Sequence, residues 1–201
     1  AYMFENINTK ELKSREAIKN SFMNAINLCP KENISDIWHH LIYRIYIELK
    51  QYTNPEQSWV RTSGEAFELF IQDTYSNLLL KDNIKIKALI SRDEKNEVLK
   101  RLNLSDKIGS SKIDLIVEKK NMGIGKDHNN FGIVGIMHAK VSLAERVSDD
   151  VPASQILMKT GLKSLLITLD VKSFPPPNGD LINRGELGSV DRPTDKRKYI
   201  E

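Results

Sequence analysis

The sequence predicts an α/β fold, with a central mixed β-sheet flanked by helices and preceded by an N-terminal helical region. Three observations predict it. Apolar residues recur at helical spacing through about residue 80, as on one face of an amphipathic helix. From residue 84 onward, short apolar runs of strand length replace that pattern. Segments of helical pattern separate several of these runs, and this order is typical of α/β proteins.

Three helices are predicted before the first strand. Residues 9–28 have amphipathic spacing, and Ser35 is a suitable N-cap for a second amphipathic helix over residues 36–52. Thr62 is followed three residues later by Glu65, which is a capping-box pattern. This pattern predicts that a third helix begins at Thr62.

Four strands and two further helices complete the predicted core. The run 131–139 is long, apolar and bounded by polar residues, which indicates a buried strand. It is predicted to form a hairpin with the preceding strand, because the connecting segment contains two glycines. Pro152 suits the first turn of the last helix. The stretch 148–154, which includes Asp149 and Asp150, is expected mainly to cap this helix, with a DNA contact as its second role. The strands are predicted at residues 84–90, 113–118, 131–139 and 164–170, and the helices at residues 93–102 and 152–160.

Composition restricts the classes of function. The 201 residues carry a formal net charge of +3, which permits a polyanionic partner without requiring one. The single cysteine excludes an internal disulfide and a multi-cysteine zinc site, and it fits a reducing cytoplasm. No apolar run reaches the ~18 residues of a membrane span, and the N-terminus lacks a signal-peptide pattern. A cytoplasmic protein without a membrane partner is therefore expected.

Two charged residues lie where a protein core rarely places them. Asp114 is inside the apolar run 113–117, and Lys140 follows the apolar run 131–139. Charged groups are costly to bury without partners. Asp114 could simply hydrogen-bond to backbone at a strand start, and Lys140 could extend to solvent. If the two strands are neighbours, the pair would instead form one polar site suited to a metal ion and a phosphate.

A magnesium ion requires further oxygen ligands beside Asp114. Position 138, in the neighbouring predicted strand, would naturally carry a second carboxylate, but the residue there is His138. The nearest substitute is Glu68 on the third predicted helix, because Glu65 is already explained by the capping box. A solvated helix face is the alternative explanation for Glu68.

These features resemble the PD-(D/E)XK nuclease superfamily. The shared order is Gly-x-x-Phe-Glu on a helix (residues 64–68), an aspartate in an apolar strand and a lysine at the end of the next strand. The stretch KVSLAER (residues 140–146) is similar to the Lys-x-Ser-(x)-Arg-Glu/Asp-Arg stretch of BsaWI-like type II restriction endonucleases, the CCGG-reading group. There are three departures from the pattern. Ala144 replaces an arginine, Ile113 replaces a frequent proline, and His138 replaces the usual strand carboxylate.

The resemblance implies a restriction-endonuclease-like core and a Mg²⁺-dependent, sequence-specific endonuclease that cuts double-stranded DNA as a homodimer in a bacterial or archaeal cell. The core would span residues 57–175. Residues 1–56 would form a helical region for dimerisation or for the DNA side, and residues 176–201 a polar extension. The implied catalytic residues are Asp114, Lys140 and Glu68. The implied metal ligands are Asp114, Glu68 and the carbonyl of Ala139, and the implied DNA-binding residues are Lys112, Ser142, Glu145 and Arg146.

Two other functions remain open for such a sequence. A structure-selective nuclease, such as a junction resolvase, would use the same core. A non-catalytic DNA-binding protein would retain the fold after losing the site, and His138 would then mark the loss. Arginine binds guanine with two hydrogen bonds and a carboxylate accepts from cytosine, so Glu145 and Arg146 favour an enzyme that reads sequence. An exposed ion pair on a turn is the simpler explanation of these two residues.

Overall fold

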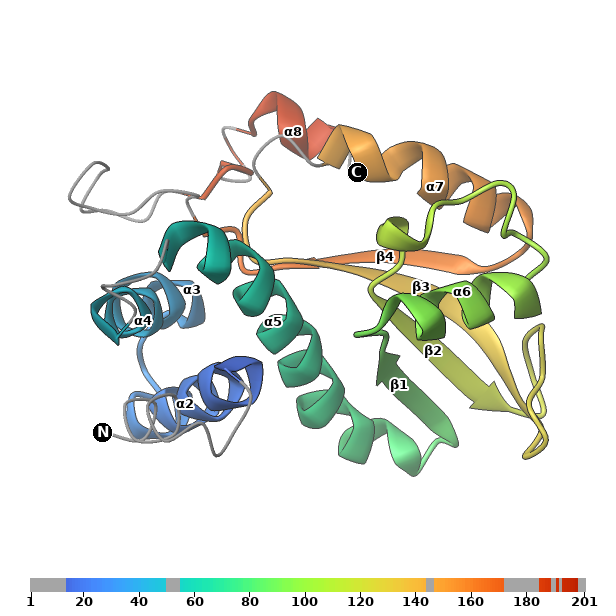
Figure 1. Ribbon diagram of the computed structural model, residues 1–201, viewed down its shortest axis with the longest axis horizontal. Coiled ribbons are helices and arrows are strands. Elements are labelled where there is room, and N and C mark those ends of the chain that lie inside the picture. Colours follow the sequence, from blue (N-terminus) through green and yellow to red (C-terminus); the bar gives the residue numbers. More distant parts are fainter. Residues whose placement is uncertain are drawn as a thin grey trace.

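The computed structural model describes residues 14–49, 55–143, 147–171, 185–188, 191 and 193–198, and it confirms the predicted α/β class (Figure 1). At its centre lies a four-stranded sheet in the order β1-β2-β3-β4. The first three strands are antiparallel and β4 is parallel to β3, so the sheet is mixed. The strands are β1 (Ile84–Ala88), β2 (Leu115–Lys120), β3 (Phe131–Lys140) and β4 (Lys163–Thr168).

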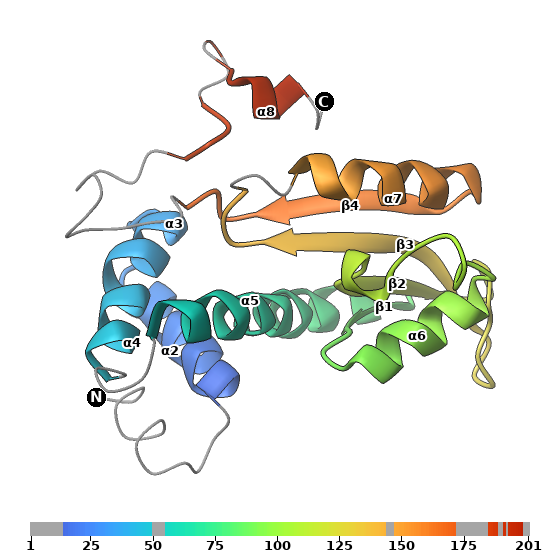
Figure 2. The ribbon, with the colours of Figure 1, turned by 45° about the horizontal axis from the view of Figure 1, so that its top comes forward.

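Helices cover both faces of the sheet (Figure 2). The long helix α5 packs on one face together with the N-terminal helices, whereas α6 and α7 pack on the other face. Successive side chains of a strand point to opposite faces of the sheet, so one strand contributes to two apolar cores. Leu115 joins the core on the α5 side, and Ile116 joins the core on the opposite side. The helices are α2 (Ser14–Leu28), α3 (Ile34–Asp36), α4 (Tyr43–Leu49), α5 (Pro55–Leu80), α6 (Arg92–Arg101), α7 (Val147–Lys159) and α8 (Asp195–Lys198), with a π-helical segment η1 (Ile37–Ile42) and a 3-10 turn η2 (Ser110–Lys112).

The second predicted helix has a different start. Asn33, not Ser35, is the N-cap, and its side-chain oxygen accepts a hydrogen bond from the backbone N–H of Ser35 (2.8 Å). The π-helical segment carries Trp38, whose ring contacts Phe22 on α2 and Trp59 on α5. This aromatic cluster attaches the N-terminal helices to α5.

The predicted helix start at Thr62 is wrong, because α5 already begins at Pro55 and continues through Thr62. Proline suits the first turn of a helix, since it has no N–H to leave unpaired there. Thr62 instead lies in the helix interior, where its hydroxyl donates to the carbonyl of Ser58 (2.7 Å). A capping box is present at the start of α6, formed by Ser91 and Glu94.

The last predicted helix also begins earlier than expected. α7 starts at Val147, so Pro152 lies inside the helix rather than at its first turn. Asp150 is therefore not a capping residue but lies in the first helical turn. A carboxylate is favoured there by the partial positive charge of the helix N-terminus.

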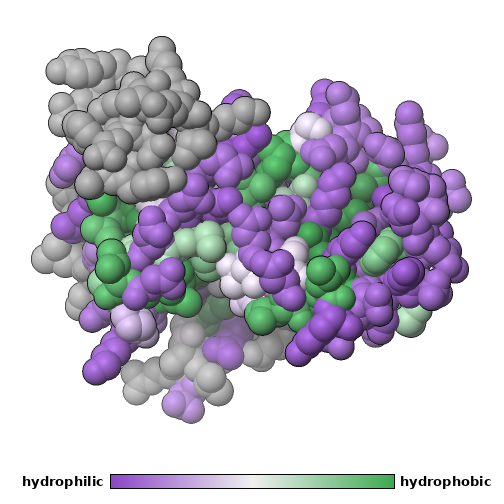
Figure 3. Space-filling model, turned by 90° about the horizontal axis from the view of Figure 1, so that it is seen from below, coloured by the Kyte–Doolittle hydropathy of each residue, from purple (hydrophilic) through white to green (hydrophobic). Residues whose placement is uncertain are grey.

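The surface mixes polar and apolar side chains. Polar side chains and smaller apolar patches share the face seen in Figure 3. Large apolar side chains that remain exposed include Leu28 at the end of α2, and Leu78 and Leu80 at the end of α5. No described helix combines the length and the apolar composition that crossing a membrane requires.

Candidate active site

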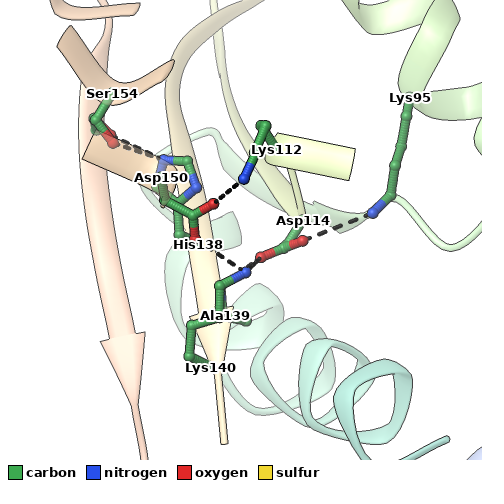
Figure 4. Close-up of polar contacts among 9 residues, drawn as sticks. Lys95, Lys112, Asp114, His138, Ala139, Lys140, Asp150 and Ser154 are labelled. Atoms are coloured by element: carbon green, nitrogen blue, oxygen red, sulfur yellow. Dashed lines mark hydrogen bonds and ion pairs between the residues drawn. The ribbon is translucent and has the colours of Figure 1, made fainter. Parts of the chain in front are cut away.

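Asp114 lies at the centre of a group of charged side chains (Figure 4). The strand predicted from residue 113 begins at Leu115, so Asp114 immediately precedes β2, and it is only 5% exposed. Its Oδ2 accepts hydrogen bonds from the backbone N–H of Ala139 (3.0 Å) and from the ammonium of Lys140 (2.8 Å). Its Oδ1 lies 3.7 Å from the ammonium of Lys95. The expected backbone contact is present, but the carboxylate also contacts two lysines.

Lys140 ends β3 and does not extend to solvent. Its side chain is 15% exposed, and its Nζ lies between Asp114 and the Oδ2 of Asp150 (3.3 Å). Burial alone would lower the pKa of Lys140, but the charges and hydrogen bonds of the two carboxylates raise the pKa above its usual value. Lys140 is therefore a permanent cation at neutral pH, suited to binding a phosphate rather than to accepting a proton.

Asp150 is a site residue that the sequence reasoning missed. It projects from the first turn of α7, where its Oδ2 meets Lys140 and its Oδ1 lies 3.5 Å from the Nζ of Lys112. Two carboxylates from distant parts of the chain thus share the ammonium of Lys140. The available signal was an acidic residue near the start of the helix that follows the lysine strand, which we interpreted first as a cap and second as a DNA contact.

Glu68 lies on α5 and is buried, with 8% exposed, so the solvated helix face is the wrong explanation for it. Within the described residues it forms no hydrogen bond or ion pair. Burial raises the pKa of Glu68 to about 8, and the negative charge of Asp114 contributes in the same direction. Glu65, in contrast, is neutralised by Arg15, whose Nη1 lies 2.8 Å from its Oε2. Among the described side chains of α5, Glu68 is therefore the acid that lacks a cationic partner.

A cavity of about 490 Å³, much larger than the ~30 Å³ share of one water molecule, connects most of these side chains, but Asp150 is not part of its lining. Its lining includes Glu68, Asp114 and Lys140, together with Lys95 of α6. Lys95 was not predicted, because nothing local in the sequence shows that α6 reaches the site. Its side chain is 16% exposed, and its ammonium lies on the side of Asp114 opposite to Lys140 (Figure 4).

His138 occupies the strand position where a carboxylate was expected. It is 2% exposed, and its Nε2 lies 3.1 Å from the hydroxyl oxygens of both Ser154 and Ser164. Burial lowers the pKa of His138, against the opposing influence of the nearby carboxylates, so the ring is neutral at pH 7. The imidazole joins β3 to α7 and β4, and it is not part of the cavity lining.

The four residues predicted to bind DNA have different outcomes. Ser142 lines the cavity just beyond Lys140. Lys112 lies on η2, next to the site, and pairs with Asp150. Glu145 and Arg146 fall outside the described residues. Ala139, the predicted carbonyl ligand, lines the cavity and is held by its N–H to Asp114.

The oxygen atoms of the site are of the chemical type that a hard divalent cation prefers. Carboxylate and carbonyl oxygens are the ligands that magnesium prefers, and Glu68 is a buried acid whose ionisation a nearby cation would favour. Among the described residues, however, no three His, Cys, Asp or Glu side chains already lie close enough to hold a metal ion. Lysine ammonium groups contact both Asp114 and Asp150. A metal ion would therefore have to compete with lysine.

Comparison with known proteins gives consistent matches. Residues 83–201 match the family described as BsaWI restriction endonuclease type 2. The chain is 54% identical over 200 residues to the type II restriction enzyme AgeI of Thalassovita gelatinovora, covering 100% of this chain and 72% of that protein. The crystal structure of a specific AgeI–DNA complex superposes with a TM-score of 0.91, covering 98% of this chain and 71% of that chain. A pre-specific BsaWI–DNA complex matches 83% of this chain and 66% of that chain at 20% identity, with a TM-score of 0.45.

Proposed function

The chain belongs to the BsaWI family of type II restriction endonucleases and is a site-specific endodeoxyribonuclease; from this premise we propose that Mg²⁺ is its cofactor and that Asp114, Glu68 and Lys140 are its catalytic residues. Enzymes of this type generally need a divalent metal ion. One observation carries the assignment. The ammonium of Lys140 is held between two carboxylates at a cavity that Glu68 also lines.

Three oxygen donors would hold the ion, namely the carboxylates of Asp114 and Glu68 and the carbonyl of Ala139. Asp150 is a fourth candidate, because its carboxylate shares the ammonium of Lys140 with Asp114. When bound, Mg²⁺ supplies Lewis-acid activation of the phosphate and of a water molecule. The competing lysines fit this proposal, since a site of closely spaced acids needs cations of some kind for stability.

Lys140 would act on the phosphate directly. Its ammonium remains charged at neutral pH and is aimed by the hydrogen bond to Asp114. A fixed cation of this kind stabilises the negative charge that develops on a pentavalent phosphate, and it orients the attacking water. Hydrolysis would break the P–O3′ bond and leave a 5′-phosphate and a 3′-hydroxyl.

The proposed DNA contacts come from Lys112, Ser142, Glu145 and Arg146, and the proposed active form is a homodimer. Ser142 supports this assignment because it lines the cavity two residues after the proposed catalytic lysine. A two-fold symmetric enzyme would match a two-fold symmetric site on DNA. Residues 1–56 are proposed to serve dimerisation or the DNA side, and α5 would link them directly to the core, because the boundary at residues 56 and 57 falls inside that helix.

The proposal is tested by digesting a plasmid of known sequence with the protein and Mg²⁺ and then mapping the cut ends. We expect discrete fragments with 5′-phosphate ends, and no cleavage when a chelator removes the metal. Cleavage in the presence of a chelator would reject the metal proposal. Sedimentation with a short cognate duplex tests the homodimer, since two chains per duplex are expected.

Arg146→Ala is predicted to lose sequence discrimination. If Arg146 forms two hydrogen bonds with a guanine, the variant should lose ~1–3 kcal/mol of discrimination at one base pair per half-site. Glu145→Ala should lose discrimination in the same way, because the carboxylate of Glu145 would accept a hydrogen bond from cytosine and orient the guanidinium of Arg146. Affinities are measured in Ca²⁺ on cognate and random duplexes. Arg61→Ala is the control, since the Arg61 side chain is 86% exposed at the cavity and should contact only phosphate. Equal losses of Arg146→Ala on both duplexes would reject base reading.

Lys95→Met is predicted to bind divalent metal severalfold more tightly when no DNA is present. The ammonium of Lys95 lies 3.7 Å from Asp114 Oδ1 and so competes with a cation for that oxygen. Calorimetric titration of the DNA-free protein with Mn²⁺ measures the effect. Lys87→Met is the matched control, because Lys87 pairs with Glu94 outside the cavity. An unchanged affinity would show that Lys95 does not compete for the metal.

A further inference from the structure

His138 connects three elements through one ring nitrogen. The residue lies in β3, two positions before Lys140, and is almost fully buried. Its Nε2 lies 3.1 Å from the hydroxyl oxygen of Ser154 on α7 and 3.1 Å from that of Ser164 on β4. Burying an imidazole is costly unless it is hydrogen-bonded. These two hydroxyls therefore satisfy Nε2, whereas Nδ1 of the same ring is buried without a hydrogen-bond partner among the described residues. The two contacts also link the strand to its neighbours.

The contact to Ser154 bears on the active site because Ser154 and Asp150 share a helix face. They are four residues apart on α7, about one helical turn or ~6 Å of rise. His138 and Lys140 are two residues apart on β3, which spans ~6.6 Å on one face of a strand. The two spacings agree, so α7 meets β3 at two points, Ser154 with His138 and Asp150 with Lys140 (Figure 4).

Apolar packing alone would define the position of α7 along β3 less precisely. The buried residues Ala153 and Leu157 attach α7 to the sheet through apolar contacts, and such contacts have no preferred direction. A hydrogen bond between a ring nitrogen and a hydroxyl has a defined length and direction. It therefore restricts sliding of α7 along β3, and such sliding would move Asp150 relative to Lys140.

We propose that His138 is a positioning residue which, through Ser154, holds α7 at the height that places Asp150 beside Lys140 in the metal site. The inference rests on the proposed function, with Asp150 as a metal-site carboxylate. Position 138, the strand position where the resembling nucleases usually carry a carboxylate, would then still contribute to the metal site in this protein. It does so indirectly, by fixing the helix that supplies an acid.

Ser154 and Ser164 provide a matched pair for the test. Each hydroxyl lies at the same distance from the same nitrogen, but only Ser154 is on the helix of Asp150. Ser154→Ala should raise the Mg²⁺ concentration for half-maximal cleavage about tenfold and weaken Mn²⁺ binding in calorimetry to a similar extent. Ser164→Ala should leave both values near those of the wild type. Ser154→Thr keeps the hydroxyl and should restore metal affinity, whether or not the alanine variant folds well.

A double variant separates positioning from a general loss of stability. In the background of Asp150→Asn, Ser154→Ala should cause no further change in metal affinity, because the group through which it acts has gone. Equal effects of Ser154→Ala and Ser164→Ala, or additive effects of Ser154→Ala and Asp150→Asn, would overturn the inference. If Asp150→Asn alone leaves metal affinity unchanged, the proposed metal site is at fault rather than the role of His138.

Discussion

Asp114→Asn and Lys140→Met are each expected to reduce cleavage of a cognate DNA site by about 10²–10³-fold or more, because the first would remove a proposed metal ligand and the second a cation proposed to act on the reacting phosphate. Asp114→Asn loses an ionised oxygen at the proposed metal site but retains an oxygen that can accept a hydrogen bond from the N–H of Ala139. Lys140→Met removes the cation between Asp114 and Asp150. The fold should survive Asp114→Asn, since groups at functional sites often oppose stability. Lys140→Met should lower the free energy of unfolding, because Asp114 and Asp150 lose the ammonium that they share.

Single-turnover cleavage of a labelled duplex in Mg²⁺ measures the loss, with thermal unfolding recorded in parallel. Asp106→Asn and Lys107→Met are matched controls, because both residues are exposed and outside the cavity lining. They should cut at the wild-type rate. A near wild-type rate for either active-site variant, in a protein that unfolds normally, would place the active site elsewhere.

Glu68→Gln is expected to remove a decrease in the stability of the metal-free protein that runs from pH 4.5 to about 8. The folded chain holds the Glu68 proton up to a pKa of about 8, whereas the unfolded chain releases it near 4.5. The native state therefore binds more protons across this window, and the free energy of unfolding falls as the pH rises through it. The loss is on the order of several kcal/mol for a shift of this size.

A divalent cation favours the ionised carboxylate, so Ca²⁺ should stabilise the wild type near pH 8 and stabilise Glu68→Gln much less. Chemical unfolding at a series of pH values, with chelator or with Ca²⁺, provides the comparison. Glu65→Gln is the control on the same helix; its partly exposed ion pair with Arg15 contributes up to ~1 kcal/mol. The same pH dependence in Glu68→Gln as in the wild type would show that Glu68 is not the titrating group. Cleavage by Glu68→Gln at the wild-type rate would remove it from the catalytic residues.

Local sequence patterns predicted the sheet well. The run 131–139 is apolar because both faces of β3 are covered, and hydrophobic periodicity detects such burial without knowledge of the partners. The same reasoning placed Asp114 and Lys140 on neighbouring strands, where their 2.8 Å contact now lies. A charge inside an apolar run is informative because burial without a partner is so unfavourable.

Helix boundaries and side-chain orientation were less predictable. Thr62 and Glu65 have the residue types and the spacing of a capping box, yet α5 begins at Pro55 and passes through them. Glu65 instead pairs with Arg15 on α2. A capping pattern is a weak local preference of about 1 kcal/mol, and tertiary packing of a long helix readily exceeds it.

The sequence by itself determined the α/β class and the hairpin, and it singled out Asp114, Lys140 and Glu68 as candidate site residues, because periodicity and charge within apolar runs are local properties. Only the tertiary structure decided that Lys95 and Asp150 join them. These two residues come from α6 and α7, which reach Asp114 and Lys140 by packing on the same face of the sheet. It also decided that Nε2 of His138 contacts two serine hydroxyls. Such contacts depend on how helices sit against strands distant in sequence, and a one-dimensional pattern does not encode that geometry.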